Sequence, residues 1–131
     1  NLKQGMVSIF LQQSLLSDKI LVKGSLERYR DQIYIDDVID AFMQLVMHPE
    51  KIKNHEIFNI CTGVGTSVKD IIHIIKEENN REYLIEVLPG TPGDQVGMIG
   101  SYKKFNDRFD WTPKFTFKTG LKEMIKWAKN G

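Results

Sequence analysis

Residues 23–45, KGSLERYRDQIYIDDVIDAFMQL, constrain the fold more than any other stretch of this 131-residue chain. A turn at Gly24 leads through an extended segment to a short apolar strand at residues 33–35, and Asp36 and Asp37 then begin a helix. Either aspartate can accept hydrogen bonds from the free N–H groups of the first helical turn. Apolar residues spaced i, i+3, i+4, i+7 and i+8 predict one buried stripe on this helix, made of Val38, Ala41, Phe42, Leu45 and Val46.

Two arginines precede the strand at a spacing that places them on the same side of an extended chain. They are Arg28 and Arg30, and two guanidinium groups on one side suit a polyanion such as a diphosphate. The alternative is ion pairing at the surface with Glu27, Asp31 or Asp36. Spacing alone favours ion pairing over ligand binding.

Composition and charge argue against several classes of function. A net charge of +1 argues against a nucleic-acid binder or a membrane-surface binder, and no apolar run approaches the ~20 residues of a membrane span. His48, His55 and His73 lack the spacing of metal ligands, so we expect no metal site. Cys61 is the only cysteine, which excludes an internal disulfide and fits a reducing, cytoplasmic compartment.

The remaining sequence alternates short helical and strand patterns. Helices are expected over residues 6–16 and 101–109 and after Ser67 and Thr116, and strands over residues 20–22, 57–61 and 83–88. Cys61 ends one of these strands, and we expect it in the core rather than as a nucleophile. Thr116 is expected to cap the last helix.

A glycine turn at residues 62–67 invites comparison with phosphate-binding loops. It contains Gly63 and Gly65, but Val68 occupies the position of the third glycine of the dinucleotide fingerprint. The simpler interpretation is a tight turn with Ser67 as the helix N-cap and Asp70 three residues later, which resembles a capping box. We therefore expect no cofactor at this turn.

Residues 30–41, RDQIYIDDVIDA, resemble the R-D-(F/Y/W)-x-Y-V-x-D-(V/L)-x-x-A segment of the NAD-dependent epimerase/dehydratase family. These extended short-chain dehydrogenases are typified by UDP-glucose 4-epimerase and dTDP-glucose 4,6-dehydratase. The resemblance implies that Arg30 contacts the diphosphate of a nucleotide sugar. It also implies an α/β fold in which residues 1–131 form the C-terminal, substrate-binding portion, with short strands alternating with about five helices and the N-terminal Rossmann core absent.

The resemblance implies further contacts to the nucleotide. Main-chain groups at Leu21 and Lys23 would face the uracil or thymine base. Gln4 falls where the family commonly has an asparagine or lysine near the phosphates. These three residues are predicted substrate ligands.

The loop at residues 89–94, PGTPGD, resembles the family's R-x-G-D loop, whose arginine commonly closes over the diphosphate. Thr91 stands at the position of that arginine, so this chain departs from the pattern. Arg28 is our candidate for the second phosphate contact. Thr91 and Asp94 are further candidates for ligand contact, although Asp94 would equally well fix the loop through main-chain hydrogen bonds.

The family's chemistry depends on two motifs that this chain lacks: the T-G-x-x-G-x-x-G turn that seats NAD, and a Y-x-x-x-K acid/base pair. The residues four positions after the four tyrosines are Ile33, Val38, Val87 and Asn106. We therefore predict no catalytic residue and no bound cofactor in this chain. NAD and enzyme activity are expected only of a longer parent protein, and because the chain begins at Asn1 we expect it to be a piece of one.

The sequence thus predicts the part of a nucleotide-sugar epimerase, similar to UDP-glucose 4-epimerase, that positions the nucleoside diphosphate. The alternatives are a dehydratase similar to dTDP-glucose 4,6-dehydratase, a nucleotide-binding module without catalysis, and a structural protein that has lost its ligand. The expected partners are a nucleoside-diphosphate sugar and the missing Rossmann domain. Alone, the chain is expected to expose apolar surface and to self-associate.

Overall fold

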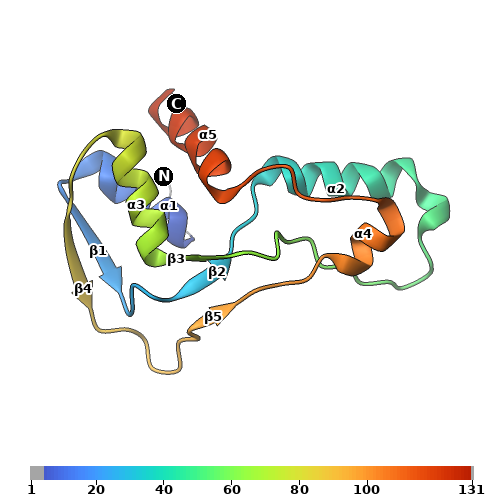
Figure 1. The fold of residues 1–131 in the computed structure, drawn as a ribbon, viewed down its shortest axis with the longest axis horizontal. Helices are drawn as coiled ribbons and strands as arrows, with labels where there is room; N and C mark the ends of the chain where they lie inside the picture. Colours follow the sequence, from blue (N-terminus) through green and yellow to red (C-terminus); the bar gives the residue numbers. More distant parts are fainter. Residues whose placement is uncertain (1–4, 131) are drawn as a thin grey trace. The chain divides into compact units, whose positions relative to one another are not determined.

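The computed structural model describes residues 5–130, and contacts divide this part of the chain into two compact units. The α1 unit comprises residues 5–29 and 66–97, and the α2 unit comprises residues 30–65 and 98–130. The described residues contain five α-helices, one 3-10 turn and five short strands (Figure 1). The α/β class and the number of helices expected from the sequence are therefore confirmed.

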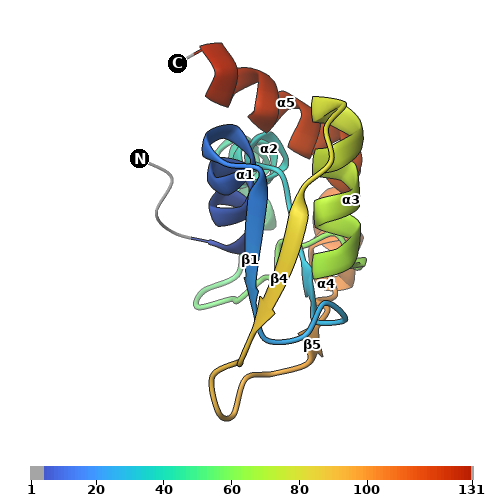
Figure 2. The same ribbon diagram turned by 90° about the vertical axis from the view of Figure 1, so that its left-hand side faces the viewer.

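The α1 unit is built around two parallel strands that lie side by side (Figures 1 and 2). β1 (Lys19–Lys23) pairs with β4 (Leu84–Leu88), so that Lys19 lies opposite Leu84 and Lys23 opposite Leu88. Alternation along β1 buries Ile20 and Val22 completely and leaves Leu21 and Lys23 exposed. Helix α1 (Met6–Leu16) contacts both β1 and α3 (Val68–Asn79).

Helix α3 begins where the sequence predicts. The Ser67 side chain accepts a hydrogen bond from the Asp70 N–H (3.1 Å), and the Asp70 carboxylate accepts one from the Ser67 N–H (3.2 Å). This reciprocal pair confirms the predicted capping box. The apolar side of the helix is buried and consists of Val68, Ile71, Ile72 and Ile75.

Three very short strands make a second sheet in the order β3-β2-β5. They are β2 (Tyr29–Asp31), β3 (Gly65–Ser67) and β5 (Gly97–Met98). The chain passes from one unit to the other within each of these strands. The strand predicted at residues 33–35 is wrong, because strand pairing stops at Asp31 and α2 already begins at Ile35.

The core of the α2 unit is aromatic. It consists of buried Ala41, Phe105, Phe109 and Trp111, against which Phe58 and other partly buried residues pack. Phe105 stacks on Phe109, with 4.6 Å between ring centroids, and the Trp111 indole N–H donates to Asp40 (2.9 Å). The helices and turn of this unit are α2 (Ile35–Met47), the 3-10 turn η1 (Pro49–Lys51), α4 (Lys103–Phe109) and α5 (Phe117–Asn130). Thr116 caps α5 as predicted, because its hydroxyl accepts the Thr119 N–H (3.2 Å).

Helix α2 departs from its predicted amphipathic pattern. Ala41 is buried as expected, but Phe42 and Val46 of the predicted buried stripe are 61% and 71% exposed. Neither acidic residue caps the helix. Asp37 is instead buried and accepts hydrogen bonds from the main-chain N–H groups of residues 114 and 115, at 2.8 and 3.1 Å. The side chain that looked like a cap therefore fixes a distant loop.

Residues 57–61, predicted to form a buried strand, form none in the described structure. Ile57 is 82% exposed, whereas Phe58 and Ile60 pack on the aromatic core and Cys61 is buried, as predicted. A β-rich run becomes a strand only when another strand accepts its hydrogen bonds, and the described chain provides none here. No helix among residues 5–130 is long and apolar enough to span a membrane.

Candidate functional site

The β1–β2 turn and the loop at residues 89–96 are held together within the α1 unit. The Gly24 N–H donates to the Leu88 carbonyl (2.9 Å), which extends the β1–β4 pairing by one bond. A methyl group added at Gly90 would lie 3.1 Å from the Gly24 Cα, so this close approach of two main chains favours glycine at position 90. Gly24 itself has a φ of 86°, a conformation that favours glycine.

Arg28 ties these two segments together through its guanidinium group. Nη1 donates to the carboxylate of Asp94 and Nη2 donates to the main-chain carbonyl of Lys23. Nε is buried and has no hydrogen-bond partner. The side chains of Arg28 and Asp94 are 20% and 29% exposed. Two predicted ligand residues, 66 positions apart, therefore form an ion pair with each other, and the buried Nε of the guanidinium has no acceptor.

The other predicted ligand residues of this unit are placed as follows. Leu21 and Lys23 lie on the exposed side of β1, and the Leu21 N–H donates to the side-chain oxygen of Gln13 (2.7 Å). That N–H therefore points away from β4 and is accessible to a side-chain acceptor. Thr91 is exposed and its carbonyl accepts the Asp94 N–H (3.1 Å), which closes a turn. Gln4 lies outside the described residues.

Arg30 is half-buried in β2, and its neighbour Asp31 organises the α2 unit. The Asp31 carboxylate accepts hydrogen bonds from the Thr62 N–H (2.8 Å) and hydroxyl (2.6 Å) and from the N–H groups of Gly63 (2.9 Å) and Gly100 (3.2 Å). Burial alone would raise the pKa of Asp31, but these hydrogen bonds, led by the Thr62 hydroxyl, lower the pKa below its usual value.

The same contacts decide how the glycine turn can be used. A phosphate loop needs free main-chain N–H groups, and those of Thr62 and Gly63 already point at the Asp31 carboxylate. The Ser67 N–H is taken by Asp70. A negatively charged carboxylate among these donors would repel a pyrophosphate, so the turn does not fit NAD.

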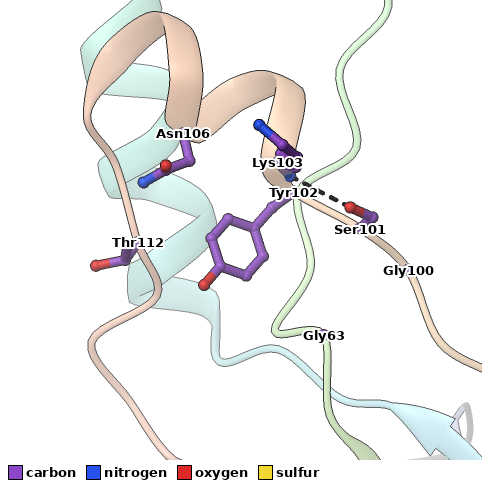
Figure 3. Close-up of a pocket in the computed structure, with 7 residues that line it drawn as sticks. All are labelled: Gly63, Gly100, Ser101, Tyr102, Lys103, Asn106 and Thr112. Atoms are coloured by element: carbon purple, nitrogen blue, oxygen red, sulfur yellow. Dashed lines mark hydrogen bonds between the residues drawn. The ribbon is translucent and has the colours of Figure 1, made fainter.

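A shallow polar depression lies beside this turn in the α2 unit (Figure 3). Figure 3 shows the Tyr102 ring extending between Asn106 and the main chain at Gly63. The nearby Lys103 ammonium is engaged by Asp107 (2.6 Å). The remaining lining residues are Gly100, Ser101 and Thr112, so the depression offers neutral hydrogen-bonding groups and no carboxylate or imidazole. Sequence analysis did not identify it, because its residues come from segments about 40 positions apart.

Cys61 does not supply a nucleophile. Burial, with the nearby negative charge of Asp31, raises the pKa of its thiol, so the reactive thiolate is disfavoured. Among residues 5–130, no group of three or more histidine, cysteine, aspartate or glutamate side chains is placed to hold a metal ion. The described residues thus show neither an activated thiol nor a metal-binding cluster.

Comparisons with known proteins agree over almost the whole chain. Residues 4–124 match the family model for GDP-mannose 4,6 dehydratase. The chain is 31% identical over 125 residues to the dTDP-4-dehydro-6-deoxyglucose reductase of Escherichia coli, covering 95% of this chain and 38% of that protein. It is 32% identical over 127 residues to a putative UDP-glucose 4-epimerase of Methanocaldococcus jannaschii, covering 96% of this chain and 39% of that protein.

Solved structures are similar over the same range. The UDP-glucose 4-epimerase of Thermotoga maritima, solved with UDP-glucose, has a TM-score of 0.86 and 29% identity, and covers 98% of this chain. The dTDP-glucose 4,6-dehydratase of Bacillus anthracis, solved with NAD, shares the fold with a TM-score of 0.84. The chain spans 40% and 39% of those two chains, respectively. It corresponds to their C-terminal part.

Proposed function

Because this chain belongs to the NAD-dependent epimerase/dehydratase family, we propose that it is the substrate-binding portion of a nucleotide-sugar epimerase. Its role is to position the nucleoside diphosphate for chemistry carried out elsewhere in a longer protein. The observation that carries this proposal is the likeness, over 98% of the chain, to an epimerase solved with UDP-glucose. Residues 1–131 would form one portion with this single role.

Three features would recognise the nucleotide. Arg30 would bind the diphosphate, with Arg28, two residues earlier in the chain, as a second cation. The edge of β1 that faces away from β4 would present main-chain groups of Leu21 and Lys23 to the base. The direction of the Leu21 N–H, which donates to the Gln13 side chain, supports this role. Thr91, which stands where the family commonly has an arginine, would contribute at most a neutral contact.

NAD belongs to the parent protein in this proposal, since relatives of this fold are solved with NAD. The glycine turn of this chain does not fit the cofactor, and the tyrosine–lysine pair is absent. The chain alone is therefore proposed to be inactive. A cytoplasmic location remains part of the proposal, because the single cysteine is unpaired and buried.

The proposal also assigns a partner to the exposed face of α2. Six large apolar side chains follow one another at helical spacing, each 47–71% exposed: Ile35, Ile39, Phe42, Met43, Val46 and Met47. We call this set the α2 apolar face. A group of exposed apolar side chains on one helix is typical of an interaction surface.

A missing domain is the occupant that best fits the α2 apolar face. About three fifths of the length of each of the two solved relatives described above lies outside the region that this chain matches. The β-rich residues 57–61, in the same unit, lack a strand partner within the described chain. A sheet-containing domain would cover an apolar helix face and could pair with a β-rich segment that has no strand partner. Without that domain, the α2 apolar face is proposed to drive self-association.

Titration calorimetry with UDP tests the binding role. We expect saturable binding, and Arg30→Ala should weaken it by at least about tenfold, since a charge-assisted hydrogen bond contributes about 1.5–3 kcal/mol. Arg81→Ala is the matched control, because Arg81 pairs with Asp18 on the surface of the α1 unit. Preference for dTDP over UDP would favour the dehydratase alternative. No saturable binding of either nucleotide would overturn the proposal and favour a structural module.

A further inference from the structure

The ion pair between Arg28 and Asp94 places a carboxylate on the cation that the proposed function assigns to a phosphate. Nη1 of Arg28 is engaged by Asp94, Nη2 by the Lys23 carbonyl, and Nε is buried without a partner. Carboxylate and phosphate oxygens are the same kind of acceptor for a guanidinium group, and both favour paired contacts. Asp94 therefore occupies a position that a phosphate oxygen could take.

Asp94 lies in a turn of the loop at residues 89–96. Asp94 follows Gly93, whose φ of 80° marks a turn and beside which a methyl group would meet no other atom within 4 Å. The turn is closed by one main-chain hydrogen bond, from the Asp94 N–H to the Thr91 carbonyl. The Gly24–Gly90 contact at the start of the loop does not involve Asp94. The ion pair between Arg28 and Asp94 is thus separate from the contact that holds the base of the loop.

We propose that Asp94 is an internal competitor for the anion at Arg28, which a phosphate group of the ligand displaces on binding. The inference rests on the proposed function only in naming a nucleoside diphosphate as the ligand. The displacement costs little, because a partly exposed ion pair contributes little to stability. A phosphate group carries more charge than one carboxylate and can also use the unpaired Nε. Asp94 thus lowers the affinity for singly charged anions more than for a diphosphate.

The test measures binding of inorganic pyrophosphate and of UDP to the purified protein and its variants. Asp94→Asn removes the charge but keeps the side-chain shape, so both ligands should bind about threefold to fivefold more tightly. Arg28→Gln should weaken pyrophosphate binding, and the double variant should lose the gain. Glu86→Gln is the charge control, because it removes a carboxylate of the same unit that pairs with Lys19 instead. Its affinity should match that of the unchanged protein.

The proposal that Asp94 competes for the anion at Arg28 is overturned if the Asp94→Asn variant binds pyrophosphate no more tightly than the unchanged protein, or does not bind it. An equal gain in Glu86→Gln, or in the Arg28→Gln background, would also overturn it, since the effect would not act through Arg28. A different binding result is expected if the proposed function is wrong but Asp94 does compete for the anion. The protein would then bind pyrophosphate, with the Asp94→Asn gain, but would not bind UDP.

Discussion

Helices α2 and α3 show how differently two amphipathic patterns can be used in one chain. The apolar residues of α3 are buried, with Val68, Ile71 and Ile75 fully inaccessible. The apolar residues of α2 are divided: Ala41 reaches the aromatic core, whereas the α2 apolar face is open. The α1 unit therefore buries the whole apolar side of α3. The α2 unit buries Ala41 but leaves the α2 apolar face exposed. This difference supports the proposal that the α2 apolar face contacts a partner.

The largest effect should come from truncating a buried residue of α3. Ile75→Ala should lower the free energy of unfolding by about 2–5 kcal/mol, because it leaves a cavity in a closed core. Val46→Ala on the α2 apolar face should change it by less than about 0.5 kcal/mol. Urea denaturation of both variants measures the contrast. Equal losses would show that the α2 apolar face is buried in solution.

The next largest effect concerns the polar contact that fixes α2. Asp37→Ala should cost about 1–3 kcal/mol, because two main-chain N–H groups at residues 114 and 115 lose their acceptor. Asp36→Ala is the control, since Asp36 is exposed and caps nothing. Thermal denaturation distinguishes the two. A larger loss for Asp36→Ala would mean that the helix is capped as its sequence suggests.

The capping box of α3 should have a smaller effect that depends on pH. Ser67→Ala should cost about 0.5–2 kcal/mol at neutral pH. The hydrogen bond from the Ser67 hydroxyl is the main cause of the lowered pKa of Asp70. The stabilisation is therefore present above the ordinary aspartate pKa, about 3.9, and is lost as pH falls through the lowered value. Asp70→Asn should flatten this part of the stability–pH curve, and an unchanged curve would contradict the assignment.

The smallest effect on stability should accompany a clear effect on association. The double variant Phe42→Lys/Val46→Lys should unfold within about 0.5 kcal/mol of the unchanged protein, because both side chains are already exposed. Its self-association should weaken by about tenfold or more, since two charges enter the apolar patch. Sedimentation velocity over a range of concentrations measures this. Glu123→Lys, on α5, changes the net charge equally and should leave association unaltered.

Local patterns were predictable, whereas contacts between distant segments were not. The capping box depends on Ser67 and Asp70, three residues apart, so the sequence was sufficient. Asp37 was misassigned because its actual partners lie 77 and 78 residues away. The run at residues 57–61 has strand propensity, but pairing needs a neighbouring strand that the described chain does not provide.

In the candidate site, too, the sequence identifies single residues but not the contacts between distant segments. Arg28 and Asp94 were each identified from the sequence as candidate ligands, but their ion pair was not foreseeable, because it joins segments 66 residues apart. For Asp31 the sequence suggests only surface pairing with an arginine. In the structure its four hydrogen bonds join it to Thr62, Gly63 and Gly100. These partners lie too far along the chain for a sequence pattern to predict them.

Amide chemical-shift mapping of the 15N-labelled protein during a UDP titration tests the central claim most directly. The account predicts saturable shifts at Leu21, Lys23 and Arg30, and none on the exposed side of α5. Shifts confined to the depression around Tyr102, or no shifts at all, would contradict the proposed contacts of Leu21, Lys23 and Arg30 with a nucleoside diphosphate.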